Sequence, residues 1–483
     1  MRSLVYGHGG RGRFLRTSLT RTSDGSVDSR GGTPHLSAPR MRPQLVRMTV
    51  LEIYEQVRRE GARADQALQR VLRREKQLRS VERRAVSDTV YGLLRLQGRV
   101  DALLQRALQS RGGALDRLAT PTQHLLRYAA YLIVGERQAP ESAANLAGPE
   151  VTPYRWVLEL LATPDELPQT GDALEALAVA TSLPRWLARL WSEQLGEAEV
   201  RALASALNQR APLTVRVNEL RLTRDELLER LRGDGARVEP TPLSPLGVTF
   251  VGRTNVFALK AFKEGLFEVQ DEGSQLIALA CGARPGQLVV DACAGAGGKA
   301  LALAAEMRNK GRLVACDRDS RRLLEMKPRA RRSGVHNWEA RGVPEGAAGE
   351  ARIADLVGNA DVVLVDAPCS GLGALRRNPD ARWRLDEAEI DTFPPRQREI
   401  LDRYAKLVKP GGRLVYATCS INRRENEDVR AAFLESHPEF RPAPPAKLFG
   451  EELAKKVARE GDVQLLPNRH GTDGFYIAGF ERS

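Results

Sequence analysis

The amino-acid sequence predicts an α/β fold in which a doubly wound, Rossmann-like domain follows an all-helical domain and a small α+β unit. Three observations support this prediction. Apolar residues recur at helical spacing over residues 48–195, short alternating strands bracket a helix over 212–270, and buried-strand patterns alternate with helical patterns from about residue 283 onward. Alternation of this kind is typical of a parallel sheet covered by helices on both faces.

Length and composition indicate a multidomain protein with ordinary apolar cores. The chain has 483 residues, of which 42% are hydrophobic and 28% are charged. No apolar run reaches about 18 residues, so we expect no membrane span. The formal net charge of +13 favours a polyanionic partner, with nucleic acid first.

Residues 1–47 form a basic tail. They are rich in Arg, Ser and Gly and lack apolar periodicity, which predicts disorder. The helical pattern begins near Met48, so Met41 and Met48 are both candidates for the true start. An Arg-rich, acid-poor tail also fits an organelle transit peptide, which is the alternative.

The cysteines all lie in the C-terminal half, at Cys281, Cys293, Cys316, Cys369 and Cys419. Their spacing fits no zinc site, so we expect no metal. An odd number of thiols suits a reduced, cytoplasmic setting. We interpret Cys281 and Cys316 as small buried hydrophobes.

Within residues 48–195, apolar side chains form helical stripes. The stripes are Val50, Ile53, Tyr54 and Val57; Val86, Val90, Leu93 and Leu94; and Leu125, Leu126, Ala129, Leu132 and Ile133. The opposite faces are rich in arginine, which suits either plain solvated surface or contact with phosphates. Residues 183–195 are predicted to form a helical linker.

The remaining elements follow from strand patterns and helix signals. In the small α+β unit, strands are predicted at 213–218, 248–251 and 266–269, and Thr223 and Glu226 have the spacing of a capping box that opens a helix over 223–232. In the C-terminal domain, strands are predicted at 288–291, 313–317, 361–366 and 413–417, with a weaker strand at 334–341 and a last one at 475–480.

A glycine-rich turn, residues 291–299, follows the first strand of the C-terminal domain. Gly295, Gly297 and Gly298 would let the backbone approach a ligand at a helix N-terminus. The pattern is neither GxGxxG nor a Walker sequence, so a plain turn is the alternative. Asp317 ends the next strand, where a carboxylate can bind ribose hydroxyls; the alternative is a helix cap. Together these features predict an adenosine-type cofactor, either NAD or S-adenosylmethionine.

Two cysteines decide between these cofactors. The segments 366–370 (DAPCS) and 417–420 (ATCS) each follow a buried strand, which places both thiols at the carboxyl edge of the sheet, where α/β sheets bind ligands. C5 of a pyrimidine is a poor nucleophile toward a methyl sulfonium, but addition of a thiolate at C6 makes C5 enamine-like. That chemistry needs a cysteine to add, a carboxyl group near N3 and a second group for release. Asp366, Cys369 and Cys419 offer this set.

With these residues in place, the chain resembles the Nop/Sun family of RNA cytosine-5 methyltransferases, and within it the bacterial Sun/Fmu (RsmB) type, which methylates small-subunit ribosomal RNA. The resemblance spans about residues 48–483. The matching pieces are 267–275 (FEVQDEGSQ), 291–299, 366–371, 376–383 (RRNPDARW), Gln397, 409–412, 418–420, 425–427 (ENE) and 470–475 (HGTDGF).

The resemblance implies a domain order and a set of residue roles. The domains would be a tail at 1–47, a NusB-like helical RNA-binding domain at 48–195, a linker with the small α+β unit at 196–282, and a Rossmann-like methyltransferase domain at 283–483. Cys419 would be the nucleophile, and Cys369 would assist release of the methylated product. Asp366 would lie between cofactor and base, with Lys299 close to it. S-adenosylmethionine would be held by Cys293, Ala294, Gly295, Ala296, Gly297, Gly298, Lys299, Asp317 and Asp366.

The chain departs from the family pattern at three positions. The glycine turn has Ala296 where Pro is usual and Ala300 where Thr or Ser is usual, and neither change removes a ligand atom. Val343 falls near the third-strand position where an acidic residue commonly meets the adenine side. Either the true position is a neighbouring one, or that contact comes from the backbone.

A basic loop after the first cysteine is a candidate RNA contact. Arg376, Arg377, Arg382 and Arg384 surround Trp383, and arginine with an aromatic ring at the mouth of a site suits RNA backbone and base stacking. The alternative is a solvated loop.

We therefore expect an S-adenosylmethionine-dependent RNA cytosine-5 methyltransferase that acts on small-subunit (16S) ribosomal RNA in the cytoplasm and turns its target base out of the stack. Transfer RNA is an alternative substrate. A DNA cytosine-5 methyltransferase would use the Pro-Cys thiol as nucleophile and leave Cys419 without a role. A non-catalytic, RNA-binding ribosome assembly factor is the alternative from another class.

Overall fold

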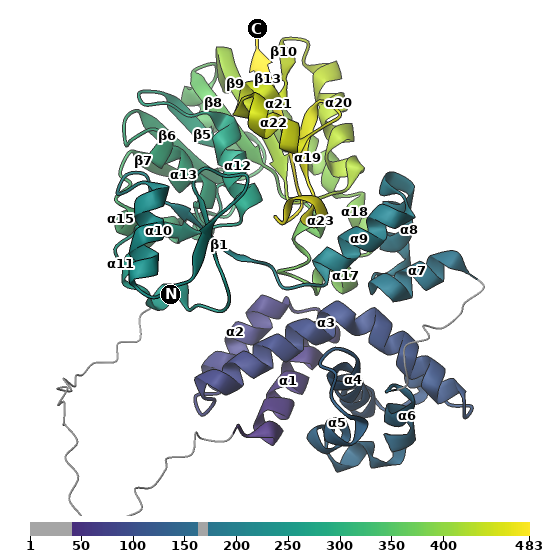
Figure 1. The fold of residues 1–483 in the computed structure, drawn as a ribbon. Coiled ribbons are helices and arrows are strands. Elements are labelled where there is room, and N and C mark those ends of the chain that lie inside the picture. The colour runs from purple at the N-terminus through teal and green to yellow at the C-terminus, as the bar shows by residue number, and fades with distance from the viewer. Residues whose placement is uncertain (1–40, 163–171) are drawn as a thin grey trace, which may run out of the picture. The chain divides into compact units, whose positions relative to one another are not determined.

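The N-terminal part of the chain is helical, as its apolar stripes predict. The structure is a computed structural model that describes residues 41–162 and 172–483, so the predicted tail up to residue 40 lies outside the described residues. The first helices are α1 (Pro43–Arg58), α2 (Ala64–Arg74), α3 (Ser80–Gln109), α4 (Thr120–Val134), α5 (Pro140–Ala147) and α6 (Arg155–Leu160) (Figure 1). The predicted stripe residues are buried together in one core, with Leu125 partly buried at its margin. None of the described helices is long and apolar enough to cross a membrane.

Helix α1 begins earlier than the sequence pattern predicts. Its first residue is Pro43, a position where the missing N–H of proline costs no hydrogen bond. Val46 is buried and Met48 is exposed. The apolar face of the helix therefore starts at Val46, and the prediction that the pattern begins near Met48 is wrong.

Helices α7 to α9 share a core with residues close to the two cysteine segments. They are α7 (Ala173–Thr181), α8 (Arg185–Leu195) and α9 (Glu197–Leu207). Trp191 and Leu203 from these helices pack in one cluster with Leu372 and Ile421. The helical linker predicted over 183–195 is thus a helix, and its apolar face is buried against the C-terminal half of the chain.

The small α+β unit is an antiparallel sheet with strand order β2-β3-β1-β4. Its elements are β1 (Leu213–Val217), α10 (Arg224–Gly233), β2 (Val238–Pro240), β3 (Gly247–Phe250), α11 (Lys260–Lys263) and β4 (Phe267–Val269). The capping box is confirmed, because the Thr223 hydroxyl accepts the Glu226 N–H and the Glu226 carboxylate accepts the Thr223 N–H. Strand β2 was not predicted, since it is only three residues long and ends in a proline.

The large sheet has a parallel centre and an antiparallel edge, in the order β11-β12-β13-β9-β8-β5-β6-β7, with β10 also paired to β13. The parallel strands are β5 (Leu288–Asp291), β6 (Arg312–Asp317), β7 (Trp338–Gly342), β8 (Ala360–Asp366) and β9 (Val408–Thr418). The antiparallel strands are β10 (Phe440–Ala443), β11 (Ala458–Arg459), β12 (Asp462–Leu465) and β13 (Phe475–Arg482). The expectation of a purely parallel sheet is corrected at this edge, because the short link from β12 to β13 cannot make the crossover that parallel pairing needs.

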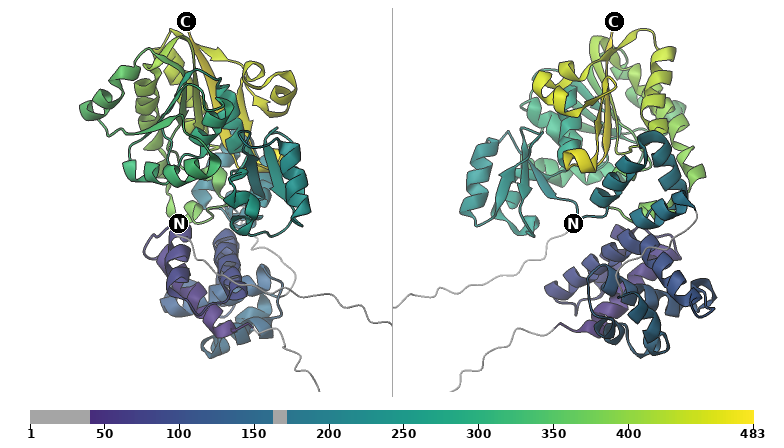
Figure 2. Two further views of the ribbon diagram at one scale, coloured as in Figure 1. Left: turned by 90° about the vertical axis from the view of Figure 1, so that its left-hand side faces the viewer. Right: turned by 45° about the vertical axis from the view of Figure 1, so that its right-hand side comes forward.

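Helices cover both faces of the large sheet, which confirms the doubly wound arrangement (Figure 2). One face packs against α12 (Glu272–Cys281) and α13 (Gly298–Glu306), and the other against α19 (Phe393–Ala405) and α20 (Glu427–Ser436). Cys281 and Cys316 are buried in these two cores, as predicted.

The remaining helices are α14 (Ser320–Leu324), α15 (Met326–Ser333), α16 (Ala347–Ile353), α17 (Ala381–Arg384), α18 (Glu387–Ile390), α21 (Pro445–Phe449), α22 (Glu451–Val457) and α23 (Pro467–His470).

Candidate active site

The two predicted cysteines meet at the carboxyl edge of the parallel strands. Strands β8 and β9 are parallel neighbours with Asp366 opposite Ala417, and the Ala367 N–H donates to the Ala417 carbonyl at 2.8 Å. The segments that follow both strands therefore leave the sheet at the same height. Cys369 Sγ and Cys419 Sγ lie 3.2 Å apart, and both side chains are half-buried.

A charged pair lies at the end of β8. Lys299 Nζ is 2.6 Å from Asp366 Oδ2. Burial alone would lower the pKa of Lys299, but the charge and hydrogen bond of Asp366, with Asp291 nearby, raise it above its ordinary value. Lys299 is therefore a protonated ammonium group held against the Asp366 carboxylate.

The glycine turn forms between β5 and α13. Its backbone is held by the Ala294 N–H, which donates to the Cys316 carbonyl at 2.8 Å, and by the Gly297 N–H, which donates to the Ala294 carbonyl at 2.8 Å. Gly297 has a φ of +81° and caps α13, and a Cβ at this position would lie 2.5 Å from Met326. Glycine is thus required at 297 by both conformation and space.

Asp317, predicted to bind a ribose, ends β6 beside this turn. Its Oδ2 accepts the Gly295 N–H at 2.8 Å and its Oδ1 accepts the Asp319 N–H at 2.8 Å. The carboxylate therefore orders both the glycine turn and the start of the next helix. Each oxygen still has acceptor capacity, so the ribose role stays a prediction.

A cavity of about 400 Å³ lies at the glycine turn and the Lys299–Asp366 pair, and its lining does not include Asp317 or the two cysteines. Of the predicted cofactor residues, Cys293, Ala294, Gly298, Lys299 and Asp366 line it. Arg377, predicted only as an RNA contact, also lines it, together with residues that had no predicted role: Val269, Gln270, Asp271, Ser274, Asp291, Arg329 and Asp473. Most of the unpredicted wall comes from residues 267–275 and 470–475. Both segments carried the family resemblance without an assigned role. Nothing in the sequence singles out Arg329, because it is one of several basic residues in the same helical segment.

Asp291 is the most unusual group in the cavity wall. It is buried, and neither carboxylate oxygen has a hydrogen bond of ordinary geometry to another described residue, although the Cys293 N–H is close enough to lower its pKa. Burial and then the charge of Asp366 raise its pKa to about 7. A buried carboxylate that lacks well-aligned donors is suited to a cationic or hydrogen-bonding ligand.

Two arginines of the basic loop do not have the RNA-contacting role that the sequence predicts. Arg382 is buried and donates to the Ser182 carbonyl and to Asn208 Oδ1, and Arg376 is buried and donates to the Gly471 carbonyl. The prediction that these two arginines contact RNA is wrong, because both side chains are buried and directed to oxygens inside the protein. The Trp383 indole N–H donates to the Leu94 carbonyl at 2.6 Å.

Arg377, in contrast, reaches the cavity. Its guanidinium donates to Asp473 Oδ2 at 2.5 Å and to Asp271 Oδ2 at 2.8 Å. Arg384 is exposed. Val343, the uncertain third-strand position, is buried, and its N–H donates to the Asp317 carbonyl at 2.9 Å.

Comparison with known proteins gives this site its context. The sequence profile described as 16S rRNA methyltransferase RsmB/F matches residues 278–481. The chain is 30% identical over 448 residues to the probable ribosomal RNA small subunit methyltransferase B of Synechocystis, a match that covers 89% of this chain and 98% of the relative. This chain belongs to the RsmB/F methyltransferase family.

Further matches agree with this placement. The ribosomal RNA small subunit methyltransferase B of Vibrio cholerae is 31% identical over 84% of this chain and 90% of its own length. The crystal structure of PH0851 is 28% identical, with a TM-score of 0.73 over 92% of this chain and 99% of that chain. A NusB family profile matches residues 44–147, and an RsmF/B ferredoxin-like profile matches 183–257. The predicted NusB-like domain is therefore confirmed.

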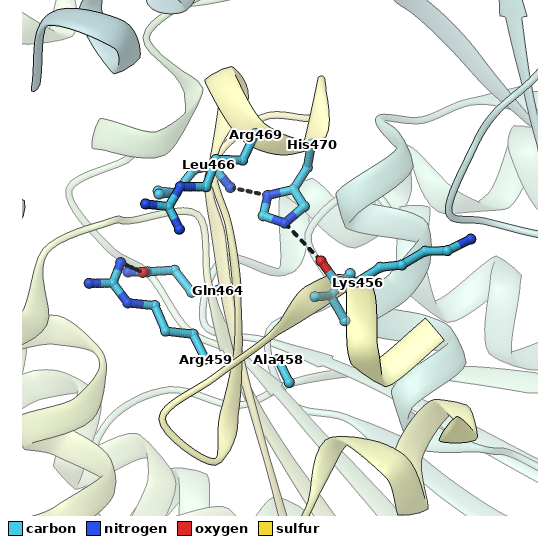
Figure 3. Close-up of a pocket in the computed structure, with 8 residues that line it drawn as sticks. Lys456, Ala458, Arg459, Gln464, Leu466, Arg469 and His470 are labelled. Carbon is cyan, nitrogen blue, oxygen red and sulfur yellow. Dashed lines mark hydrogen bonds between the residues drawn. The ribbon is translucent and has the colours of Figure 1, made fainter. Parts of the chain in front are cut away.

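This RsmB/F methyltransferase has a second cavity of about 400 Å³ beside α22 and α23 (Figure 3). His470 accepts the Leu466 N–H at Nδ1, so its Nε2 carries a proton and donates to the Lys456 carbonyl at 3.2 Å. The Arg459 guanidinium donates a hydrogen bond to Gln464, and the Arg469 guanidinium donates to the Glu199 carboxylate. The cavity contains none of the predicted site residues, and most of its polar side chains already have partners within the protein.

Proposed function

We propose that this chain is an S-adenosylmethionine-dependent RNA cytosine-5 methyltransferase that acts on a cytosine of small-subunit (16S) ribosomal RNA through a covalent cysteine adduct. The observation that carries the proposal is the pair of thiols 3.2 Å apart at the end of β8 and β9, beside the Asp366–Lys299 pair. Two thiols and a carboxylate at one sheet edge are the groups that addition, charge neutralisation and release require.

The cavity residues fit S-adenosylmethionine. Cys293, Ala294, Gly298 and Lys299 of the turn line the cavity at the start of α13, and the buried Asp291 carboxylate in its wall suits an ammonium group. Asp317 lies outside the cavity lining, holds the turn through the Gly295 N–H, and has acceptor capacity for ribose hydroxyls. We assign binding to Cys293, Ala294, Gly295, Ala296, Gly297, Gly298, Lys299, Asp317 and Asp366, and we add Asp291. The cofactor, when bound, supplies an electrophilic methyl group.

Cys419 acts first in the proposed reaction. Its thiolate adds to C6 of the cytosine, the C6–S bond forms, and an electron pair moves through the ring toward N3. The Lys299 ammonium, acting through the Asp366 carboxyl, donates a proton to N3 and so neutralises the charge that develops there. C5 then carries enough electron density to accept a methyl group.

Release restores the aromatic ring. Water takes the remaining C5 proton, the C6–S bond breaks with its electron pair returning to the Cys419 sulfur, and the proton on N3 returns to the Asp366–Lys299 pair. We assign assistance in this step to Cys369, whose sulfur lies beside that of Cys419.

We also propose a division of labour along the chain. The NusB-like helices bind RNA through basic faces, and we place the end of this domain near residue 161, where its core ends, rather than at 195. Helices α7 to α9 and the small α+β unit connect it to the methyltransferase domain. We propose a cytoplasmic location, where ribosomal RNA is modified.

The test is bisulfite sequencing of ribosomal and transfer RNA from cells with and without this gene. We expect loss of one 5-methylcytosine from small-subunit RNA. Loss from transfer RNA instead would keep the chemistry and change the substrate. With no site lost, and no methyl transfer to RNA or DNA by the purified protein, the assembly-factor alternative would replace this proposal.

A further inference from the structure

The segment 425–427 (Glu-Asn-Glu) has no role in the proposed reaction, yet its first residue is placed unusually. Glu425 ends a short 3-10 turn (Arg423–Glu425) ahead of α20 and is fully buried, with 0% of its surface exposed. Burying a carboxylate is costly unless donors surround it, so the neighbours of Glu425 indicate why it is there.

The carboxylate of Glu425 connects the two cysteine segments. Its Oε2 accepts the Ser370 N–H at 2.8 Å, and its Oε1 accepts the Ser370 hydroxyl at 2.6 Å and the Ser420 hydroxyl at 2.6 Å. Ser370 directly follows Cys369, and Ser420 directly follows Cys419. One side chain therefore holds the residue after each cysteine.

A glutamine of α19 adds two hydrogen bonds to this network. Gln397 Nε2 donates to Glu425 Oε2 at 3.1 Å and to the Pro368 carbonyl at 3.1 Å, on the other side of Cys369. Both residues that flank Cys369 are thus bonded to this buried network. Every one of these groups donates a hydrogen bond to Glu425. An ionised carboxylate can only accept hydrogen bonds, so its neighbours match its needs.

We propose that Glu425 is a positioning residue for the cysteine pair, and that its buried carboxylate sets the separation of the two thiols and reserves Cys369 as the proton-bearing member. This inference rests on the proposed function, because it explains how the two cysteines take different roles. Glu425 touches neither substrate nor cofactor in this scheme and acts through Ser370 and Ser420.

The charge of Glu425 supports the second half of the proposal. The hydrogen bond with Cys419, burial, and then the charges of Cys419 and Glu425 hold the pKa of the Cys369 thiol above its ordinary value. The titratable groups that face Cys369 are Tyr416 from β9, Cys419 from the segment that follows β9, and Glu425 from the turn before α20. Glu425 thus disfavours a thiolate at Cys369, the cysteine that we assign to release.

The first experiment measures alkylation of Cys369 across pH in the full chain without RNA, by site-resolved mass spectrometry with iodoacetamide. Glu425→Gln removes the charge, and we expect the alkylation midpoint to fall by about one pH unit, which is about tenfold faster reaction below the midpoint. Glu427→Gln is the matched control. It changes a carboxylate of the same segment whose charge acts on Arg423 and Tyr476, whereas the charges that raise the pKa of Cys369 are those of Cys419 and Glu425, so its profile should equal that of the unchanged protein.

Three further variants keep the proposal testable if Glu425→Gln does not fold. Glu425→Asp keeps the charge on a shorter side chain. Its Cys369 alkylation profile should therefore be closer to that of the unchanged protein than the Glu425→Gln profile is, while its methyl transfer should be slower than that of the unchanged protein. Ser370→Ala and Ser420→Ala remove donors and leave the charge, so they should slow methyl transfer without shifting that profile.

An unchanged Cys369 profile in Glu425→Gln, or a shift of equal size in Glu427→Gln, would overturn the proposal. Because alkylation needs neither RNA nor methyl transfer, this result is separate from the fate of the proposed function. Absence of methyl transfer in the unchanged protein would overturn that function alone.

Discussion

Cys369 Sγ and Cys419 Sγ lie 3.2 Å apart although the residues are 50 positions apart in the sequence. The closeness follows from parallel pairing, since β8 and β9 are neighbours and end at the same height. A parallel sheet thus brings two separate strand-end motifs into one reaction centre.

The first prediction concerns these two thiols. Cys419→Ala should abolish methyl transfer and form no covalent RNA link, because it removes the nucleophile. Cys369→Ala should form the link through Cys419 and release it slowly, so a denaturation-resistant protein–RNA adduct should accumulate on gels. Cys281→Ala, at a buried helical thiol, is the control and should behave like the unchanged protein. Normal turnover by Cys369→Ala without an adduct would contradict the release role.

The second prediction concerns Lys299 and Asp366. Lys299→Met should leave the Asp366 carboxylate close to Asp291 without its counter-ion, and should lower the free energy of unfolding by roughly 2–3 kcal/mol at neutral pH. Methyl transfer should also fall, because no proton is held near N3. Urea unfolding measures the first effect. The double variant Lys299→Met, Asp366→Asn should recover much of the stability but not the activity. If the double variant is no more stable than Lys299→Met, the two residues are not coupled.

The strands that position this site could be predicted from the sequence. The short, apolar segments before Asp291, Asp317 and Asp366 predict buried strands by their length and flanking turn residues, and the structure has β5, β6 and β8 there. The edge strands β10 to β12 could not be predicted, because each is only two to four residues long, β10 and β12 pair with the distant strand β13, and β11 pairs only with β12. The mixed edge of the sheet therefore depends on contacts between distant segments.

Charged side chains limited the prediction of the site. An arginine in a loop carries the same sequence signal whether it faces RNA or, like Arg382, donates to buried carbonyls. The same holds for Glu425, whose importance depends on which donors surround it. Asp291, at the start of the predicted turn, was not assigned a binding role, because only the structure reveals that its carboxylate is buried without a hydrogen bond of ordinary geometry to another described residue.

The third prediction concerns the contact between α3 and the loop after Cys369. A Cβ added at Gly98 would lie 2.8 Å from the Trp383 ring, whose N–H is fixed on the Leu94 carbonyl. Gly98→Val should therefore displace Trp383 and lower the free energy of unfolding by about 1–3 kcal/mol, measured by urea unfolding. Gly233→Ala is the control, because a Cβ there meets no atom within 4 Å and α10 gains helix propensity. Equal stability of the two variants would contradict this packing argument.

The fourth prediction is a pH dependence set by Asp291. In the free protein its pKa is raised to about 7, by burial and then by the charge of Asp366, from an ordinary value of 3.8. Between these values the folded protein holds a proton that the unfolded chain has lost, so the buried carboxyl destabilises the fold progressively as pH rises from about 4 to 7. Asp291→Asn cannot ionise, and its stability relative to the unchanged protein should increase across that window and stay level above it.

The same group should make cofactor binding pH-dependent. If Asp291 meets the ammonium group of S-adenosylmethionine, binding requires the ionised carboxylate, so affinity should rise about tenfold per pH unit below 7 and level off above it. Calorimetry in buffers of different ionisation enthalpy should detect close to one proton released per cofactor bound at pH 6. In Asp291→Asn both the slope and the proton release should disappear. A slope that persists in this variant would assign the titration to another group in the cavity and remove Asp291 from the binding site.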